Sequence, residues 1–269
     1  MYSTEDSLST ATTTLEIDGP LAFLTFNRPE ARNAMTWEMY AALVDACDRV
    51  DRDDAVRVLI LRGAGGKAFV AGTDIAQFQS FRGADDGNAY ERRIDEVLGR
   101  LERVTRPTIA QIEGVAAGGG CAIAVTCDLR VATPESTLGV PIARTLGNCI
   151  SSATCARLLD LAGPAIVKDL LFTGRFITAT DAFALGLVSR VAPADVIATV
   201  VHRLATDIAS NAPLTVRATK EMVRRLLAKR RRLEEGSDRD LIELCYASAD
   251  FKEGVEAFLA KRKPQWKGR

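Results

Sequence analysis

Three consecutive glycines, Gly118, Gly119 and Gly120, are the residues whose type and spacing most directly suggest chemistry in this chain. They follow an apolar run at residues 108–112 and precede a small-residue segment, residues 121–127, that we expect to be helical. Glycine permits backbone paths and close ligand approaches that a Cβ atom would block. The first N–H groups of a helix have no partner within it and carry partial positive charge. The pattern therefore predicts a backbone anion site or, alternatively, a tight strand-to-helix turn without a ligand.

The composition is that of an ordinary globular protein without a dominant charge. The 269 residues are 47% hydrophobic and 26% charged, which is enough for a sizeable core in one or two domains. Lys and Arg together number 35, as do Asp and Glu, so no overall basic field favours nucleic acid or a membrane. No apolar run could span a bilayer, and the polar start of the chain lacks the apolar segment of a signal peptide. We therefore expect a cytoplasmic protein.

The cysteines and the single histidine suggest neither a metal site nor a catalytic triad. The six cysteines include no C-x-x-C pair, and most have apolar neighbours, so we expect reduced, buried thiols and no metal. His202 is the only histidine and falls in a predicted helix far from the glycines, so a Ser–His triad is not expected.

Hydrophobic periodicity predicts mixed α and β structure first and mostly helices afterwards. Residues 14–17 and 21–26 are predicted to form a hairpin, and Thr36 to cap a helix that ends near residue 50. Further strands are predicted at residues 56–61, 108–112, 128–132 and 188–191, and further helices at residues 86–104, 149–161, 165–171, 179–184, 194–210, 214–227, 238–246 and 250–261. The short, irregular repeat favours stacked strand–turn–strand–helix units over a doubly wound sheet. We expect an α/β core at residues 12–195 and a helical region at residues 196–269.

Five motifs resemble the crotonase (enoyl-CoA hydratase/isomerase) superfamily in order and spacing. They are N-R-P-x-x-x-N-A from Asn27, K-A-F-V-A-G-T-D-I from Lys67, G-G-G-C-A-I-A-V-T-C-D-L from Gly118, T-G-R-x-I-x-A-x-x-A-x-x-x-G-L-V from Thr173 and E-A-F-L-A-K-R-K-P from Glu256. The resemblance covers roughly residues 14–264. It implies a spiral of stacked β-β-α units with a C-terminal helical region that takes part in trimerisation and covers coenzyme A. It also implies a homotrimer or a dimer of trimers, an acyl-CoA thioester as substrate, and no cofactor beyond the coenzyme A of that substrate.

The resemblance also implies an oxyanion hole. In this family two backbone N–H groups hold the thioester carbonyl, and the matching residues here are Thr73 and Gly119. Loss of an α-proton, or attack at Cβ, places negative charge on the carbonyl oxygen, where fixed donors stabilise the transition state most. Main-chain donors leave the side chain free, so threonine can replace the small apolar residue common at position 73. Asp74 is predicted to cap a short helix beginning at Ile75 rather than to do chemistry.

The sequence departs from the hydratase pattern at the two glutamates that position and activate water. The corresponding residues are Ala122 and Ile142, and neither can transfer a proton. We therefore expect weak or no hydration, and an isomerase, decarboxylase, thioesterase, or non-catalytic CoA- or RNA-binding relative stays open. Arg144 is a candidate for binding an acyl carboxylate or a developing charge, or else forms a salt bridge at the surface or between subunits. Cys149 is a less favoured candidate nucleophile because no base lies near it in sequence.

Coenzyme A is expected to contact residues matched to the family pattern. They are Glu30, Ala31, Arg32, Ala71, Thr73, Ile75, Phe258 and Lys261. In relatives the residues matching Phe258 and Lys261 come from a neighbouring subunit. Glu30 replaces a residue that is often basic, so phosphate contacts are expected from Arg28 or Arg32. The basic run at residues 229–232 is expected to be a solvated helix end, with RNA binding as the alternative and nucleic acid not the favoured partner.

Overall fold

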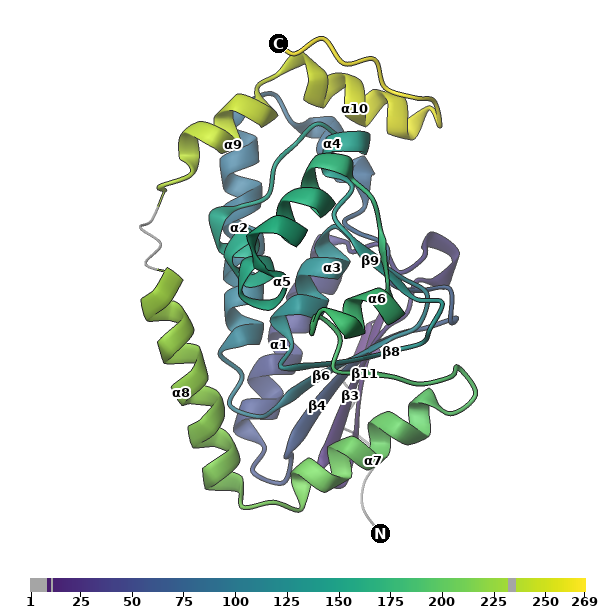
Figure 1. The fold of residues 1–269 in the computed structure, drawn as a ribbon, viewed down its shortest axis with the longest axis vertical. Helices are drawn as coiled ribbons and strands as arrows, with labels where there is room; N and C mark the ends of the chain where they lie inside the picture. Colours follow the sequence, from purple (N-terminus) through teal and green to yellow (C-terminus); the bar gives the residue numbers. More distant parts are fainter. Residues whose placement is uncertain (1–8, 11, 232–235) are drawn as a thin grey trace.

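Two sheets and the helices around them form the core of the protein (Figure 1). The computed structural model describes residues 9–10, 12–231 and 236–269. Residues 1–8 of the predicted polar tail lie outside the described residues, and so does Arg232 of the basic run.

The strands alternate between the two sheets as the chain advances. The larger sheet has the order β1-β2-β3-β4-β6-β8-β11, and the smaller sheet has the order β10-β9-β7-β5. The larger sheet contains β1 (Ser9–Thr10), β2 (Thr13–Asp18), β3 (Leu21–Phe26), β4 (Val58–Gly63), β6 (Thr108–Ile112), β8 (Leu129–Ala132) and β11 (Arg190–Val191). The smaller sheet contains β5 (Ala68–Val70), β7 (Val115–Ala117), β9 (Thr137–Gly139) and β10 (Ile177–Thr178). Because β4, β6 and β8 are each followed by a strand of the smaller sheet, the predicted spiral of β-β-α units is confirmed.

Helices cover both faces of the larger sheet. The inner helices are α1 (Trp37–Arg52), α2 (Ala84–Glu102) and α3 (Gly119–Thr126), which share the main hydrophobic core. On the other face, α7 (Ile197–Ala209) packs Ile197 and Val201 against Val58 and Ile60 of β4. The remaining helices are η1 (Pro29–Ala31), η2 (Ile75–Ser80), α4 (Ile142–Thr145), α5 (Ser152–Thr173), α6 (Ala179–Ala184), α8 (Pro213–Arg231), α9 (Arg239–Tyr246) and α10 (Ala249–Leu259).

The sequence predicts most of these elements but misplaces some boundaries. Thr36 caps α1 as predicted, because its hydroxyl accepts a hydrogen bond from Met39 N at 3.3 Å. The two helices predicted on either side of Gly163 are confirmed: they follow one another within α5 and are separated by a kink at Gly163, whose φ of 73° and ψ of 167° are not helical. The sequence did not reveal α4, because four residues are too few to show helical periodicity.

The last two helices fold back over the inner helices at one end of the molecule (Figure 1). Tyr246 of α9 and Phe251 of α10 lie with their ring centroids 4.8 Å apart, and Phe251 lies 5.8 Å from Phe78 of η2. Phe78 in turn packs edge-on against Tyr90 of α2 at 4.9 Å. This aromatic cluster fixes the C-terminal helices beside the segment that follows β5.

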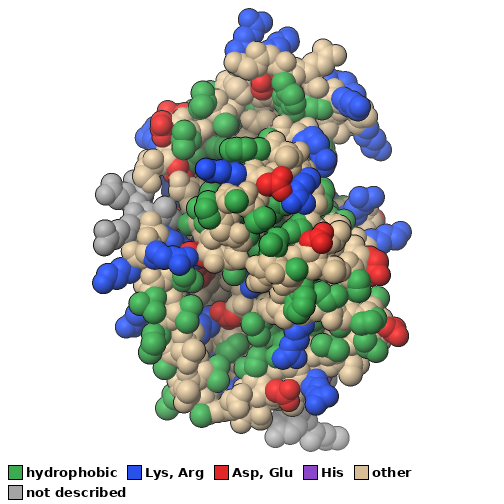
Figure 2. All heavy atoms as spheres, in the orientation of Figure 1, with side chains coloured by type: hydrophobic (Ala, Val, Ile, Leu, Met, Phe, Trp, Pro, Cys, Tyr) green, Lys and Arg blue, Asp and Glu red, His purple; other side chains and the backbone are tan. Residues whose placement is uncertain are grey.

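The surface has no extended field of one charge on the face shown in Figure 2, where basic, acidic and hydrophobic side chains are interspersed. Exposed hydrophobic side chains lie on α8, including Leu214, Met222 and Leu226, and none of that helix is buried. A cavity of about 750 Å³ separates α8 from the core. No helix in the described part of the chain combines the length and hydropathy that a bilayer span requires.

Candidate active site

The glycine turn joins β7 to α3, as the sequence predicts, and two of its positions require glycine. Gly118 has φ 49° and ψ −117°, a conformation that side chains disfavour. A Cβ atom on Gly120 would lie 2.0 Å from the carbonyl oxygen of Val70, so the helix and β5 pack too closely for any other residue. These constraints place the peptide of Gly119 at the open start of α3.

Two main-chain N–H groups, those of Thr73 and Gly119, lack an acceptor among the residues that the structure describes. The Thr73 N–H is left unpaired by the way Met35 bonds to this segment. The Met35 N–H donates to Gly72 O and the Met35 carbonyl accepts from Asp74 N, so neither bond uses the Thr73 N–H that lies between them. The Gly119 N–H belongs to the first turn of α3, where no intrahelical partner exists. The two peptides are neighbours, since a Cβ atom on Gly119 would lie 3.8 Å from Thr73 N.

Both peptides face a cavity of about 480 Å³ that also contains most of the predicted site. Ala31, Arg32, Ala71, Thr73, Ile75 and Phe258 line this cavity, as do Gly119 and Arg144. Glu30 and Lys261 are exposed and do not line it. Phe258 reaches the cavity from α10 of the same chain, because the C-terminal helices fold back over η2. A neighbouring subunit is therefore not needed to bring this ring to the site.

The Thr73 side chain takes part in a hydroxyl cluster that the sequence did not reveal. Its Oγ1 lies 2.8 Å from the hydroxyl of Tyr40 and 2.8 Å from that of Tyr90. Burial raises the pKa of Tyr40 to about 12, so this phenol keeps its proton at neutral pH. Three hydroxyls share two hydrogen bonds, which leaves one O–H without an acceptor in the described chain and free to donate to a ligand.

Asp74 and Arg28 have structural roles at the rim. Asp74 Oδ1 accepts a hydrogen bond from Ala76 N at 3.1 Å, so the predicted helix cap is confirmed. Its other oxygen lies 3.0 Å from Arg28, whose guanidinium also donates to Ala34 O. The Arg28 guanidinium is therefore already bonded within the protein. Arg32 is the arginine of this loop that lines the cavity.

Ala122 and Ile142 both line the cavity, so the positions that match the hydratase glutamates present only hydrocarbon to a ligand. Arg144 also lines it, is exposed, and forms no ion pair with any carboxylate in the described residues. The surface salt bridge considered for Arg144 is thus absent from the single chain. Its guanidinium remains available to a charged group on a ligand.

Cys149 and His202 do not line the cavity. The Cys149 thiol lies 3.6 Å from Leu241 O, and a hydrogen bond to Cys245 raises its pKa, which disfavours the nucleophilic thiolate. His202 is exposed on α7, where its Nδ1 lies 3.5 Å from the Thr206 hydroxyl. A thiol nucleophile or histidine base at this site is therefore unsupported.

Glu91 is the most informative residue that the sequence reasoning missed. It lines the cavity from α2, is 4% exposed, and has its pKa raised to about 8, chiefly by burial. A signal for it exists in the sequence, because Glu91 falls at helical spacing from Ile94 and Leu98 on the apolar stripe of α2. A carboxylate on such a stripe is unusual unless it is hydrogen-bonded or functional.

The comparisons with known proteins decide the family. The sequence model of the enoyl-CoA hydratase/isomerase family matches residues 16–269. The chain belongs to this family. It is 36% identical over 249 residues to a crotonyl-CoA hydratase of Syntrophomonas wolfei, an alignment that covers 93% of this chain and 95% of the relative. The motifs identified in the sequence therefore led to the correct family.

Solved structures of this enzyme family share the fold. An enoyl-CoA hydratase/carnithine racemase from Magnetospirillum magneticum is 33% identical, with a TM-score of 0.79 and 97% of each chain covered. A methylmalonyl-CoA decarboxylase complexed with 2S-carboxypropyl-CoA is 29% identical, with a TM-score of 0.88 and coverage of 97% of this chain and 100% of that one.

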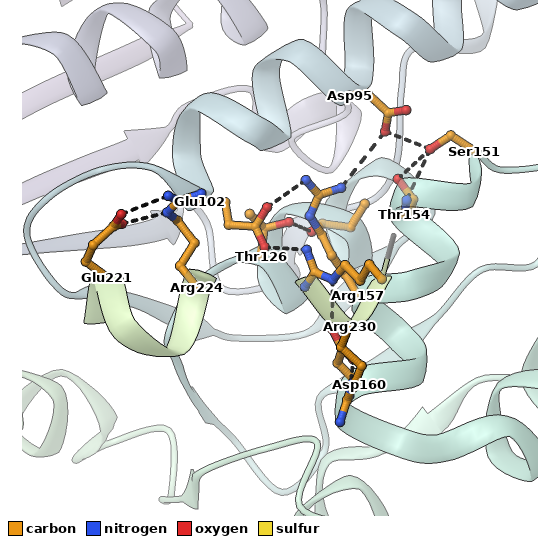
Figure 3. Close-up of polar contacts among 12 residues, drawn as sticks. Asp95, Glu102, Thr126, Ser151, Thr154, Arg157, Asp160, Glu221, Arg224 and Arg230 are labelled. Carbon is orange, nitrogen blue, oxygen red and sulfur yellow. Dashed lines mark hydrogen bonds and ion pairs between the residues drawn. The ribbon is translucent and has the colours of Figure 1, made fainter. Parts of the chain in front are cut away.

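Two arginines of the basic run at the end of α8 form ion pairs within the molecule. Arg231 pairs with Glu102 at 2.6 Å and with Asp160 at 2.8 Å. Arg230 pairs with Asp160 as well (Figure 3). These ion pairs connect α8 to α2 and α5, and the charges of both arginines are thereby partly compensated, which weakens the case for RNA binding there.

Proposed function

We propose that this protein binds an acyl-CoA thioester and stabilises its enolate with the N–H groups of Thr73 and Gly119. The observation that carries the proposal is the pair of unpaired main-chain donors facing one cavity. An enolate oxygen carries the charge that two such donors stabilise, because fixed donors act most strongly where charge develops in the transition state. Ala31, Arg32 and Phe258 would contact coenzyme A, with Arg32 the nearest cation for its phosphates.

The test of this proposal measures enolate formation rather than any one product. When the enzyme is incubated with butyryl-CoA in D₂O, the thioester should incorporate deuterium at Cα, and mass spectrometry measures this incorporation. This readout covers every reaction in which a base removes an α-proton, because each of them exchanges that position. Binding of butyryl-CoA with neither exchange above the buffer rate nor release of CO₂ from methylmalonyl-CoA would refute enolate stabilisation.

Ordinary hydration is not the proposed reaction. Because Ala122 and Ile142 cannot hold or activate water, crotonyl-CoA hydration should fall below the wild-type rate of a two-glutamate hydratase by about 10²–10⁴-fold. A spectrophotometric assay of the loss of the enoyl thioester, with such a hydratase as the reference, measures this. Hydration at the reference rate would show that another residue replaces both glutamates in activating water.

Decarboxylation of a carboxyacyl-CoA is the second candidate. The structural likeness to methylmalonyl-CoA decarboxylase favours it, as does the absence of the two glutamates. Loss of CO₂ leaves the C–C bonding pair on the thioester as an enolate, so the oxyanion hole suffices and no base is needed to start the reaction. Arg144 would bind charge at the acyl group. Release of CO₂ from methylmalonyl-CoA, compared with Cα exchange of butyryl-CoA, separates the two candidates.

We also propose that the chains associate through their helical region, as a homotrimer or a dimer of trimers. The exposed Leu214, Met222 and Leu226 on α8 support an association surface there. Sedimentation velocity at several concentrations tests this proposal, and a persistent monomer would refute it.

A further inference from the structure

Glu91 is set apart from the other charged residues of the cavity by its position. Among the described residues that line the cavity, Asp74 and Glu91 are the carboxylates and Arg32 and Arg144 the cations. Asp74 is ion-paired with Arg28 and caps η2. Arg32 and Arg144 are exposed. Glu91 is buried, faces no cation within ion-pair distance in the described chain, and therefore is the carboxyl group free to change its protonation state.

The Glu91 carboxyl group is held by two neutral donors. Its Oε1 accepts from the Tyr246 hydroxyl at 2.6 Å, and its Oε2 accepts from the Ser151 N–H at 3.0 Å. Asn148 Nδ2 donates to the Tyr246 hydroxyl at 3.1 Å and also lines the cavity. Each carboxyl oxygen keeps a second lone pair, so the group is fixed in place without being saturated.

Ser151 is itself firmly positioned. Its hydroxyl caps α5 by accepting from Thr154 N at 3.1 Å and donates to Asp95 at 2.7 Å (Figure 3). Asp95 lies 3.9 Å from Arg157, which pairs with Glu102 at 3.0 Å. Arg157 thus places its positive charge beside Asp95 and Glu102, which lie one helical turn or more from Glu91. It does not stabilise the ionised form of the Glu91 carboxyl group.

The surroundings of Glu91 favour its neutral form. Burial contributes most to its raised pKa, and the carboxylates of Asp95 and Asp238 contribute further, while the bonds from Tyr246 and Ser151 oppose the shift. The titratable and charged groups around it are Tyr40 of α1, Tyr90 and Asp95 of α2, Cys149 of the loop before α5, Asp238 before α9, and Tyr246 of α9. A carboxyl group that titrates near neutral pH can serve as either acid or base.

We propose that Glu91 is the residue that transfers protons to and from the acyl chain, from a different helix than either missing glutamate. This inference rests on the proposed binding of the thioester oxygen at Thr73 and Gly119. Tyr90, the preceding residue, contacts the Thr73 hydroxyl at 2.8 Å, and Tyr90 and Glu91 both line the cavity that Thr73 and Gly119 line. The catalytic carboxyl group therefore enters the cavity from α2 rather than from α3 or α4.

The proposed step is balanced in both directions. The Glu91 carboxylate removes a proton from an acyl carbon, and the C–H bonding pair moves into the C=C bond of the enolate while the thioester oxygen takes the negative charge. In reverse, the Glu91 carboxylic acid gives its proton to that carbon, and the enolate pair forms the new C–H bond as the C=O bond is restored. The same protonation completes a decarboxylation after CO₂ has left.

The test is Cα deuterium exchange of butyryl-CoA with Glu91→Gln, which keeps the size of the side chain. Exchange should fall by about 10²-fold or more, with the Kd for butyryl-CoA changed less than threefold. The control is Glu96→Gln on the exposed face of the same helix, which should exchange at the wild-type rate. Wild-type exchange in Glu91→Gln would overturn the role of Glu91 while leaving the proposed function intact. Release of CO₂ from methylmalonyl-CoA without exchange of butyryl-CoA in the wild type would refute proton transfer by Glu91 alone. Absence of both reactions in the wild type would instead refute the proposed function.

Two further variants separate proton transfer from a merely structural effect through the pH profile of kcat/KM for exchange, which rises as Glu91 ionises. Asp95→Asn removes a neighbouring negative charge, so the midpoint should move to lower pH. Tyr246→Phe removes a donor that stabilises the carboxylate, so the midpoint should move to higher pH. A midpoint unchanged in both variants would contradict the assignment even if Glu91→Gln failed to fold.

Discussion

Removal of the Gly119 N–H tests the oxyanion hole directly. Gly119 is the first residue of α3, a helix position that accepts proline, and proline there removes the N–H group. Loss of one oxyanion donor costs about 2.7–4 kcal/mol, which is a fall of roughly 10²–10³ in kcat. Gly119→Pro should therefore reduce Cα exchange of butyryl-CoA by that factor, with its Kd altered much less, since the interaction is strongest in the transition state.

The geometry dictates the controls for this substitution. Any Cβ atom at position 119 would lie 2.6 Å from the Tyr40 hydroxyl and 3.2 Å from Thr73 Oγ1. Gly119→Ala adds that atom but keeps the N–H, so it measures the steric effect alone. Both variants are best made in a Tyr40→Phe background, which removes the closer contact. If the proline and alanine variants lose the same activity in that background, the Gly119 N–H contributes nothing to the reaction and the reasoning is refuted.

Two other predictions follow from the cavity. Arg144→Ala should lower turnover of carboxyacyl-CoA substrates by about tenfold or more while leaving coenzyme A affinity nearly intact, because its guanidinium is proposed to bind the acyl carboxylate. Steady-state kinetics measure this change, and an unchanged rate would remove Arg144 from the mechanism. Glu91 should also make stability depend on pH. Its folded pKa of about 8 exceeds the ordinary glutamate pKa of 4.5, so its contribution to stability is fully present below pH 4.5 and is lost as the pH rises to 8. The free energy of unfolding of the wild type should thus fall by on the order of 4 kcal/mol relative to Glu91→Gln between pH 5 and pH 8.5, measured by urea denaturation; parallel curves would show that Glu91 titrates normally.

The sequence predicted the parts of this protein that depend on local chemistry. The hairpin of β2 and β3, the Thr36 cap and the Asp74 cap all follow from turn and capping preferences, which act over a few residues. The glycine turn before α3 was equally evident, because consecutive glycines mark a backbone path that other residues cannot take.

Other features could not be predicted because they join residues far apart in the chain. Tyr246 meets Glu91 across 155 positions, and Tyr40 meets Thr73 across 33. No local pattern encodes such contacts, since they depend on α9 folding back over α2 and on α1 lying beside the segment after β5. Phe258 reaches the cavity of its own chain for the same reason.

By itself, the sequence determined the family and the spiral of β-β-α units. It also predicted the loss of both hydratase glutamates and an oxyanion hole at the N–H groups of Thr73 and Gly119. Only the tertiary structure decided which groups share the cavity with those peptides, and which of the nearby charges are already paired. The physical reason is that a propensity or cap acts between neighbours in the chain. The protonation of a carboxyl group such as Glu91, by contrast, depends on its burial and on every charge that the fold brings near it.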